Sequence, residues 1–278
     1  MEKYIQIPTM FNSNTDKCRL RMLYVYALIR NEIKDSSLTA IIPQEKLSIM
    51  SGVSTTTINN YIDRLRQEGY IENTIKVPVK EGYYYNKYKM PYLKEYGIIK
   101  PDLLESDLIE AVDKGLLILI KLNCQYGTNV LEYTSINSLA KQLKVSRNTL
   151  KDTLQKLCDK GFLGLHNGWL NLSQKYFPLY VKPKDINIAY KGIYDYCIIN
   201  DCIPPYKDYN DKSGTDSMLK MIFDCCQGYK GLEGYEAVLA KLKDRCKNLP
   251  YKINFAYLKK ALLNVDTQPK QELKPIIL

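Results

Sequence analysis

The chain has 278 residues, of which 45% are hydrophobic and 25% are charged, and this composition is typical of a folded globular protein with two or three domains. It excludes disorder as the main state of the chain. Lys and Arg number 40 against 30 Asp and Glu, so the formal net charge of +10 favours a polyanionic partner such as nucleic acid.

The first third of the chain predicts a helix, a strand, a pair of helices and a β-hairpin, in that order. Ser54 is placed to cap the second helix of the pair, and Gly69 is placed to end that helix in the left-handed conformation. The predicted elements are helix Lys17–Ile33, strand Leu38–Ile42, helices Gln44–Ser51 and Thr55–Glu68, and hairpin strands Tyr70–Val79 and Tyr83–Met90.

The second helix of this pair is amphipathic. Ile58, Ile62 and Leu65 recur at three- and four-residue spacing and define an inward face. The solvent-facing side then consists of Thr55, Thr56, Asn59, Asn60, Asp63 and Arg64.

The same unit occurs a second time. Leu47–Ile58 aligns without a gap to Leu139–Leu150 at an offset of 92 residues, and the match continues to Leu163. In the hairpin of this copy, Asn167-Gly168 is a strong turn signal in which both residues must tolerate positive φ. The predicted elements are helices Asp113–Gln125, Ser138–Leu143 and Arg147–Lys160, strand Val130–Tyr133, and hairpin strands Phe162–His166 and Trp169–Leu172.

The long helix of the second copy has a more polar outward face than that of the first. Leu150, Leu154 and Leu157 form its apolar stripe. The outward side consists of Arg147, Asn148, Lys151, Asp152 and Gln155.

The C-terminal third predicts a separate helical domain after a Pro-containing segment. We expect it to contact a partner protein or a second copy of the chain, and the sequence leaves both open. Its predicted helices are Ile186–Asn200, Asp216–Gln227, Gly234–Lys247 and Asn254–Leu263, with a long exposed loop at Asp201–Gly214.

The order helix, strand, helix, turn, helix, hairpin resembles the winged helix-turn-helix family. The resemblance implies a mainly α fold with small β-hairpin wings, made of two tandem winged-helix domains and a small helical C-terminal domain. The expected boundaries are domain 1 at 1–92, a linker at 93–106, domain 2 at 107–178, a linker at 179–185, the helical domain at 186–266 and a tail at 267–278.

Four segments further resemble the front domain of phage and plasmid replication proteins: Tyr4–Pro8, Arg21–Leu28, Gly52–Leu65 and Glu68–Ile71. This implies a replication initiator or replisome organiser that binds specific double-stranded DNA. A transcriptional regulator is the alternative within DNA binding. The alternative of a different class is a docking or virion-associated scaffold that uses winged helices as interaction platforms.

The winged-helix pattern implies that the second helix of each pair enters the major groove and that the wing contacts the flanking backbone or the minor groove. Arg147 suits guanine, and Asn59, Asn60 or Asn148 suits adenine. Thr55 and Thr56 suit a thymine methyl group or a phosphate, and Gln155 shares the outward face. Phosphate contacts are expected from Arg64, Lys87, Lys89, Lys151 and Lys156.

The Tyr-rich stretch Tyr83–Tyr92 has two interpretations. It is either a stacking surface for bases or a β-ribbon that packs on its own domain. Because alternate residues of a strand point to opposite faces, at least one side must be structural, and we favour the packed ribbon.

Chemistry that needs a cofactor or a catalytic constellation is not indicated. His166 is the single histidine, which excludes sites with paired imidazoles, and the phosphate-binding and nucleophile-elbow motifs are absent. The one thiolate set open to zinc is Cys197, Cys202, Cys225 or Cys226, and Cys246, and it contains no CxxC. We expect no enzyme activity, no cofactor, no metal and no small-molecule substrate.

The expected location is the cytoplasm of a bacterial or phage-infected cell. Met1–Pro8 shows neither a signal peptide nor a transit segment, and the eight Cys lack the dense spacing of a secreted scaffold. The longest apolar run, Met22–Ile29, is too short to span a bilayer, so we expect no membrane partner.

Overall fold

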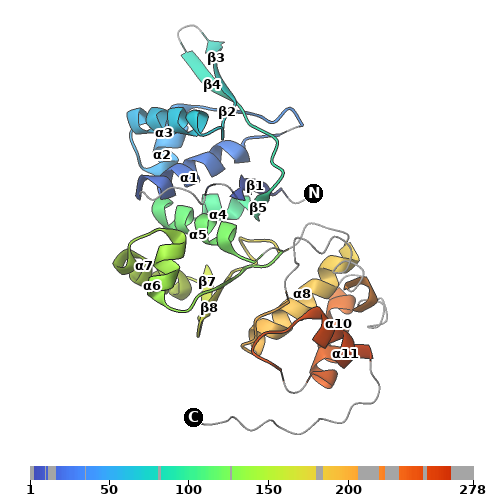
Figure 1. Ribbon diagram of the computed structural model, residues 1–278. Helices are drawn as coiled ribbons and strands as arrows, with labels where there is room; N and C mark the ends of the chain where they lie inside the picture. The colour runs from blue at the N-terminus through green and yellow to red at the C-terminus, as the bar shows by residue number, and fades with distance from the viewer. Residues whose placement is uncertain are drawn as a thin grey trace. The chain divides into compact units, whose positions relative to one another are not determined.

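The computed structural model describes residues 3–9, 11, 17–34, 36–80, 83–125, 127–179, 184–205, 219–222, 232–246 and 249–263. It divides the chain into an N-terminal unit of Met1–Gln125 with Asn129–Pro178 and a C-terminal unit of Tyr126–Thr128 with Leu179–Leu278. The described residues are mainly helical, with three small sheets in the N-terminal unit (Figure 1). No helix among them is long and apolar enough to cross a membrane.

The N-terminal unit contains the repeated succession of helix, strand, two helices and hairpin. The first copy consists of α1 (Lys17–Asn31), β2 (Thr39–Ile42), α2 (Gln44–Ser51), α3 (Thr55–Gln67), β3 (Asn73–Lys80) and β4 (Tyr83–Lys89). The second copy consists of α5 (Ala111–Asn123), β6 (Val130–Glu132), α6 (Ile136–Leu143), α7 (Arg147–Asp159), β7 (Leu163–His166) and β8 (Trp169–Leu172). The bounds agree closely with the predicted ones.

Local chemistry explains where the long helices begin and end. The Ser54 hydroxyl accepts a hydrogen bond from the Thr57 N–H at 3.2 Å and so caps α3. After α3 and α7, Gly69 and Gly161 have φ of +77° and +73°. A side chain would be strained there even though nothing lies within 4 Å of its Cβ position. The predicted cap at Ser54 and both glycine helix ends are confirmed.

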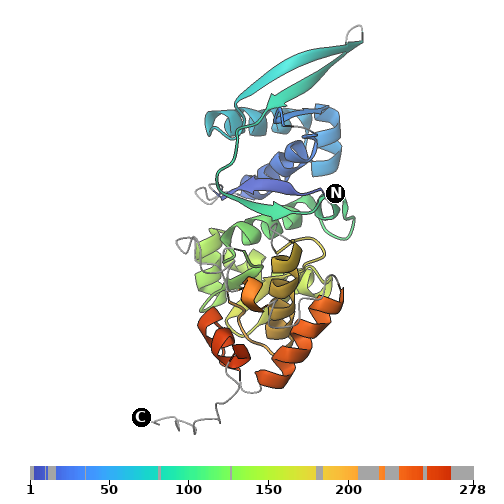
Figure 2. The ribbon, with the colours of Figure 1, turned by 90° about the vertical axis from the view of Figure 1, so that its right-hand side faces the viewer.

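Each copy closes with a three-stranded antiparallel sheet of the same strand order. The sheets are β2-β4-β3 and β6-β8-β7, so the strand before each helix pair joins the return strand of the hairpin. In the first sheet Ala40 lies opposite Tyr88, and both are fully buried against the helices. The outer part of the first hairpin projects beyond the helices (Figures 1 and 2).

The turn of the second hairpin differs from the predicted one. His166 pairs with Trp169 across the two-residue turn, as expected. Only Gly168, with φ of +83°, lies in the left-handed region, and Asn167 does not. A turn with one left-handed residue, at its second central position, requires glycine only there.

Residues 93–106, predicted as a linker, instead form structure that joins the two copies. β5 (Tyr96–Ile99) pairs antiparallel with β1 (Ile5–Pro8), and α4 (Pro101–Glu105) buries Leu103. Strands so far apart in the sequence leave no periodic pattern that reveals their pairing, which is why the sequence predicted a linker.

The two copies share one hydrophobic core, in which α1 packs on α5. A Cβ at Gly115 of α5 would lie 2.0 Å from the Leu20 carbonyl oxygen and 2.6 Å from its carbonyl carbon. Only glycine therefore allows the two helix backbones to approach this closely. The N-terminal unit is one body instead of two domains on a flexible tether.

The described part of the C-terminal unit is mainly helical, with an isolated parallel bridge between Ile203 and Lys252. It contains α8 (Lys184–Ile199), α10 (Leu232–Arg245) and α11 (Phe255–Leu263), so the end of the predicted 179–185 linker belongs to α8. Residues 219–222 are helical, and the rest of the predicted helix Asp216–Gln227 lies outside the described residues, as do most of the Asp201–Gly214 loop and the 267–278 tail. Ile193, Val238, Leu242 and Leu258 are buried in this unit.

Candidate nucleic-acid interface

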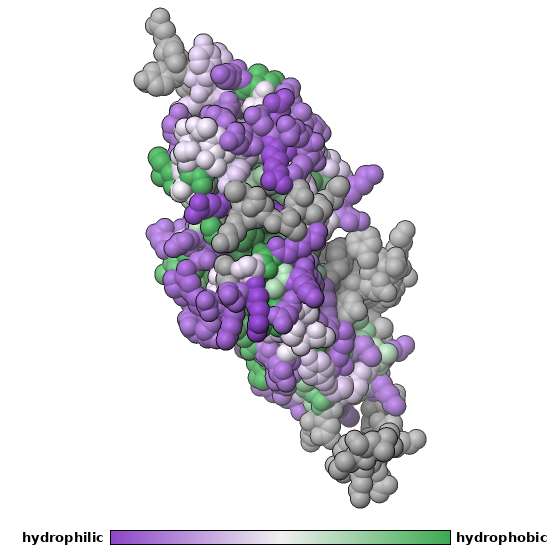
Figure 3. Space-filling model, turned by 60° about the vertical axis from the view of Figure 1, so that its left-hand side comes forward, coloured by the Kyte–Doolittle hydropathy of each residue, from purple (hydrophilic) through white to green (hydrophobic). Residues whose placement is uncertain are grey.

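The surface of the N-terminal unit seen in Figure 3 is mostly hydrophilic, with small hydrophobic patches. The candidate interface lies on the exposed faces of α3 and α7, whose inward faces carry the buried stripes predicted from the sequence. Thr55, Thr56, Asn59 and Asn60 are exposed at the start of α3, and Arg147, Asn148 and Lys151 are exposed at the start of α7. Both helix starts also present the positive end of the helix dipole.

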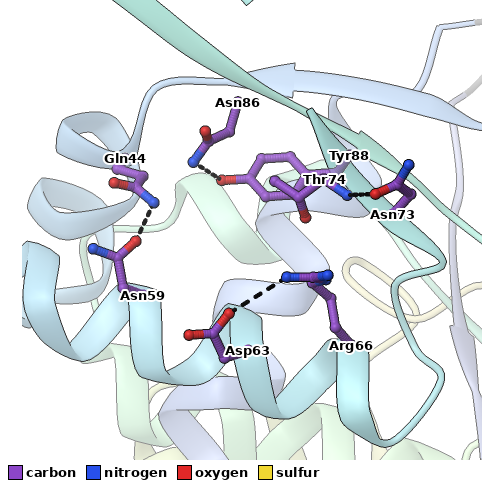
Figure 4. A network of polar contacts seen from close by, with 8 residues as sticks. All are labelled: Gln44, Asn59, Asp63, Arg66, Asn73, Thr74, Asn86 and Tyr88. Carbon is purple, nitrogen blue, oxygen red and sulfur yellow. Dashed lines mark hydrogen bonds and ion pairs between the residues drawn. The ribbon is translucent and has the colours of Figure 1, made fainter. Parts of the chain in front are cut away.

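Asn59 is held by a residue that the sequence analysis missed. The side-chain amide of Gln44, the first residue of α2, donates to Asn59 Oδ1 (Figure 4). This bond links the two helices of the pair and fixes the orientation of a candidate adenine-binding side chain. The sequence shows only a glutamine at the start of the preceding helix, and its half-buried position is known from the structure alone.

The second half of α3 is less suited to phosphate than predicted. Arg64 Nε lies 2.9 Å from Glu68 Oε1, so its guanidinium is already paired. A surface pocket of about 380 Å³ is lined by Asp63, Arg66 and Gln67 of α3 and by Glu72, which precedes β3. Two of these four residues are acidic. Two carboxylates beside one guanidinium repel a phosphate more than they attract it.

On α7 the predicted phosphate ligand Lys156 has a structural role. Its Nζ lies 2.7 Å from Oδ2 of Asp113, a side chain that is 9% exposed on α5. The hydrogen bond to Asp113 raises the pKa of Lys156. The Gln155 amide donates to Asp159 Oδ1 at 2.8 Å. The residues whose side chains point into solvent at the start of the helix are therefore the better candidates for DNA contacts.

Lys87 and Lys89 do not join the candidate residues of α3. Both lie on the outward face of β4, since the residue between them, Tyr88, is fully buried on the inward face. The inward face, which carries Asn86 and Thr74, is the one that looks toward α3 (Figure 4). Lys89 Nζ also donates to the Ser37 carbonyl oxygen at 2.6 Å. The two lysines thus point away from a duplex that lies on α3.

The Tyr-rich hairpin is packed only in part. Tyr88 is buried, and burial raises its pKa to about 12. Tyr84 and Tyr85 near the end of the hairpin are 62% and 37% exposed. The favoured interpretation as a packed ribbon therefore holds at Tyr88 but not at Tyr84 and Tyr85, because the hairpin extends beyond the helices that would cover them (Figure 1).

The second hairpin has no exposed aromatic platform. The His166 ring stacks on Trp169 with centroids 3.6 Å apart and planes inclined by 2°. His166 Nε2 lies 2.8 Å from Asn171 Oδ1, and Trp169 is fully buried. The single histidine is therefore a packing residue, as its isolation in the sequence suggests.

Three cysteines in the described part of the C-terminal unit are buried free thiols. Cys197, Cys202 and Cys246 form no disulfide, and burial raises the pKa of Cys246 to about 11, so this thiol is protonated at neutral pH. Within the ranges described above, no cluster of three Cys, His, Asp or Glu is arranged to hold a metal ion. Cys225 and Cys226, the other members of the candidate zinc set, lie outside those ranges.

No protein-family model matches the chain, and no match was found among curated proteins or solved structures.

Proposed function

We propose that the chain is a non-enzymatic DNA-binding protein built from two tandem winged helices and a helical C-terminal module. In this proposal α2–α3 and α6–α7 are helix-turn-helix pairs, and the β3–β4 and β7–β8 hairpins are their wings. The observation that carries the proposal is the repeated order of elements with the same sheet order in both copies. This is the architecture in which a second helix enters the major groove.

The start of α7 supplies the stronger base-recognition chemistry. Arg147 can donate two hydrogen bonds to guanine, Asn148 can pair with adenine, and Lys151 can neutralise a phosphate. All three are exposed. On α3, Asn59 takes the equivalent role with Gln44 as its positioning residue, and Thr55, Thr56 and Asn60 line the same helix start.

The close contact of α1 with α5 fixes the two recognition helices relative to each other. A rigid pair of recognition helices favours a target whose two half-sites have one set spacing along the duplex. The second winged helix has little net charge of its own, because residues 101–180 hold 9 basic and 8 acidic side chains. The second winged helix therefore binds through a local face.

The role that we propose is initiation or organisation of phage or plasmid replication, in the cytoplasm of a bacterial or phage-infected cell. It is supported by the resemblance of Tyr4–Pro8 and Gly52–Leu65 to the front domain of replication proteins. An initiator requires iterated target sites near its own gene, whereas a transcriptional regulator requires sites that overlap promoters.

Fluorescence anisotropy on duplexes tests this function. The purified chain is titrated onto labelled fragments of the DNA that surrounds its own gene and onto random duplexes of equal length. Preference for a fragment with iterated repeats supports an initiator, and preference for a promoter fragment supports a regulator. If no duplex binds at low salt, DNA binding is wrong, and a stable complex with another protein would then favour the docking-scaffold hypothesis.

A further inference from the structure

The outward face of the sheet β2-β4-β3 carries large apolar side chains in solvent. Lys87, on the central strand, lies between Ile41 on one neighbouring strand and Ile75 on the other. The two isoleucines are 49% and 53% exposed. Tyr85, two residues from Lys87 on the same strand and face, pairs with Val77. We call Ile41, Ile75, Tyr85, Lys87 and Lys89 the outward platform.

These apolar residues lie outside the hydrophobic core of the N-terminal unit. The inward face of the same sheet supplies the core contacts through Ala40, Ile42 and Tyr88, which are all buried. Antiparallel sheets with one solvated face ordinarily place polar residues on that face. A tyrosine and two isoleucines gathered there indicate a binding surface for a ligand with apolar parts.

The charge of the hairpin defines that ligand further. The outward face carries Lys87 and Lys89, and none of the residues paired with Tyr85, Lys87 and Lys89 on that face is acidic. Tyrosine and isoleucine faces interleaved with lysines suit a chain that combines flat apolar groups with negative charges. Single-stranded nucleic acid has this combination, because its bases are unstacked and its phosphates are spaced between them. A duplex offers such a platform only its phosphates, since its base faces are covered.

We propose that the outward platform binds single-stranded DNA, with bases packed on Tyr85 and the flanking isoleucines and phosphates held by Lys87 and Lys89. Lys89, which donates to the Ser37 carbonyl oxygen, has two further ammonium N–H donors for phosphate. This site goes beyond duplex recognition and does not depend on it, because the platform points away from α3. A protein that holds both forms of DNA can keep a strand open beside a recognised duplex.

The test uses the full chain and a fluorescein-labelled 20-nucleotide oligo(dT) in anisotropy titrations at low salt. Tyr85→Ala is expected to weaken binding about tenfold, since a stacking aromatic side chain contributes of this order per base. Tyr85→Phe is expected to retain the affinity because stacking uses the ring. The matched control is Tyr84→Ala, a change at the adjacent exposed tyrosine on the opposite face, which is expected to have little effect.

Other results would overturn the proposal. The proposal is wrong if the wild-type chain does not bind oligo(dT). It is also wrong if Tyr84→Ala and Tyr85→Ala lower the affinity for oligo(dT) equally, because the platform would then have no special role. Light scattering that shows a dimer lost on Tyr85→Ala, without oligo(dT) binding, assigns the platform to self-association instead. Arg147→Ala separates the two sites: it is expected to weaken duplex binding and to leave oligo(dT) affinity unchanged.

Discussion

Lys156 Nζ of α7 lies 2.7 Å from Asp113 Oδ2 of α5, so a lysine on the candidate recognition helix neutralises a nearly buried carboxylate of the helix beneath it. The pair anchors α7 to the core of its own copy. This geometry divides the five DNA contacts predicted on α7 into two roles, one in stability and one in binding. Stability and binding measurements can separate these roles.

Lys156→Met is expected to lower the free energy of unfolding because Asp113 would lose its partner. The expected loss is about 2 kcal/mol, a value between those for exposed and for buried ion pairs. Urea denaturation measures this loss. The matched control on the same helix is Lys151→Met, for which we expect unchanged stability and a shallower salt dependence of DNA affinity. Equal stabilities of the two variants would contradict the structural role of Lys156.

Arg147→Ala is expected to lower the preference for one base pair of the target by roughly 1 to 3 kcal/mol, the range for a lost bidentate contact to guanine. Anisotropy on the target and on single-base variants gives this number position by position. A uniform loss on every duplex would show that Arg147 contacts phosphate and not a base edge.

Gly115→Ala is expected to destabilise the N-terminal unit by 3 kcal/mol or more, on the order of a severe core overpacking. The added Cβ would lie 2.0 Å from the Leu20 carbonyl oxygen, so α1 and α5 must separate. Alanine is the better helix former, so a loss cannot arise from α5 itself. Gly69→Ala is the control, with an expected cost of about 1 kcal/mol for positive φ without a clash. Similar melting temperatures for the two variants would refute the close helix contact.

The buried Lys121 gives the stability of the chain a distinctive pH dependence. Its Nζ donates to Asn129 Oδ1 at 2.6 Å, and burial lowers its pKa from 10.5 to about 8. Between these values the unfolded chain binds a proton that the folded chain does not, so this group makes stability rise with pH, by up to about 1.4 kcal/mol per pH unit.

The comparison of wild type with Lys121→Met isolates this effect from the tyrosines and thiols, which titrate in both proteins. We expect the stability of the wild type relative to the variant to increase from pH 8 to pH 10. Parallel stability curves for the two proteins over this range would mean that Lys121 keeps its ordinary pKa.

Much of the N-terminal unit follows from local rules of sequence. The cap at Ser54 and the glycine at position 69 mark the ends of α3, and the apolar period fixes which side is buried. The contacts that escaped prediction join residues far apart in the chain: β1 with β5, Gly115 with Leu20, and Lys156 with Asp113. Such contacts depend on how elements pack, and no local period encodes them.

The candidate site shows the same division. That Arg147 and Asn148 would be exposed at a helix start follows from their place after Ser146 and opposite the leucine stripe. The Gln44–Asn59 hydrogen bond could not be predicted without knowing the angle between α2 and α3. The exposure of the outer tyrosines of the first hairpin could not be predicted without knowing that the hairpin extends beyond the helices beneath it.

The salt dependence of duplex affinity tests the central claim most directly. The chain is titrated onto its preferred duplex from low to physiological salt, beside the Lys151→Met variant. DNA binding through the two helix faces predicts that log affinity falls linearly with log salt, with a slope near −0.9 for each neutralised phosphate, and that the variant's slope is smaller by about one contact. Affinity that does not change with salt, or no affinity for any duplex at low salt, would contradict the account.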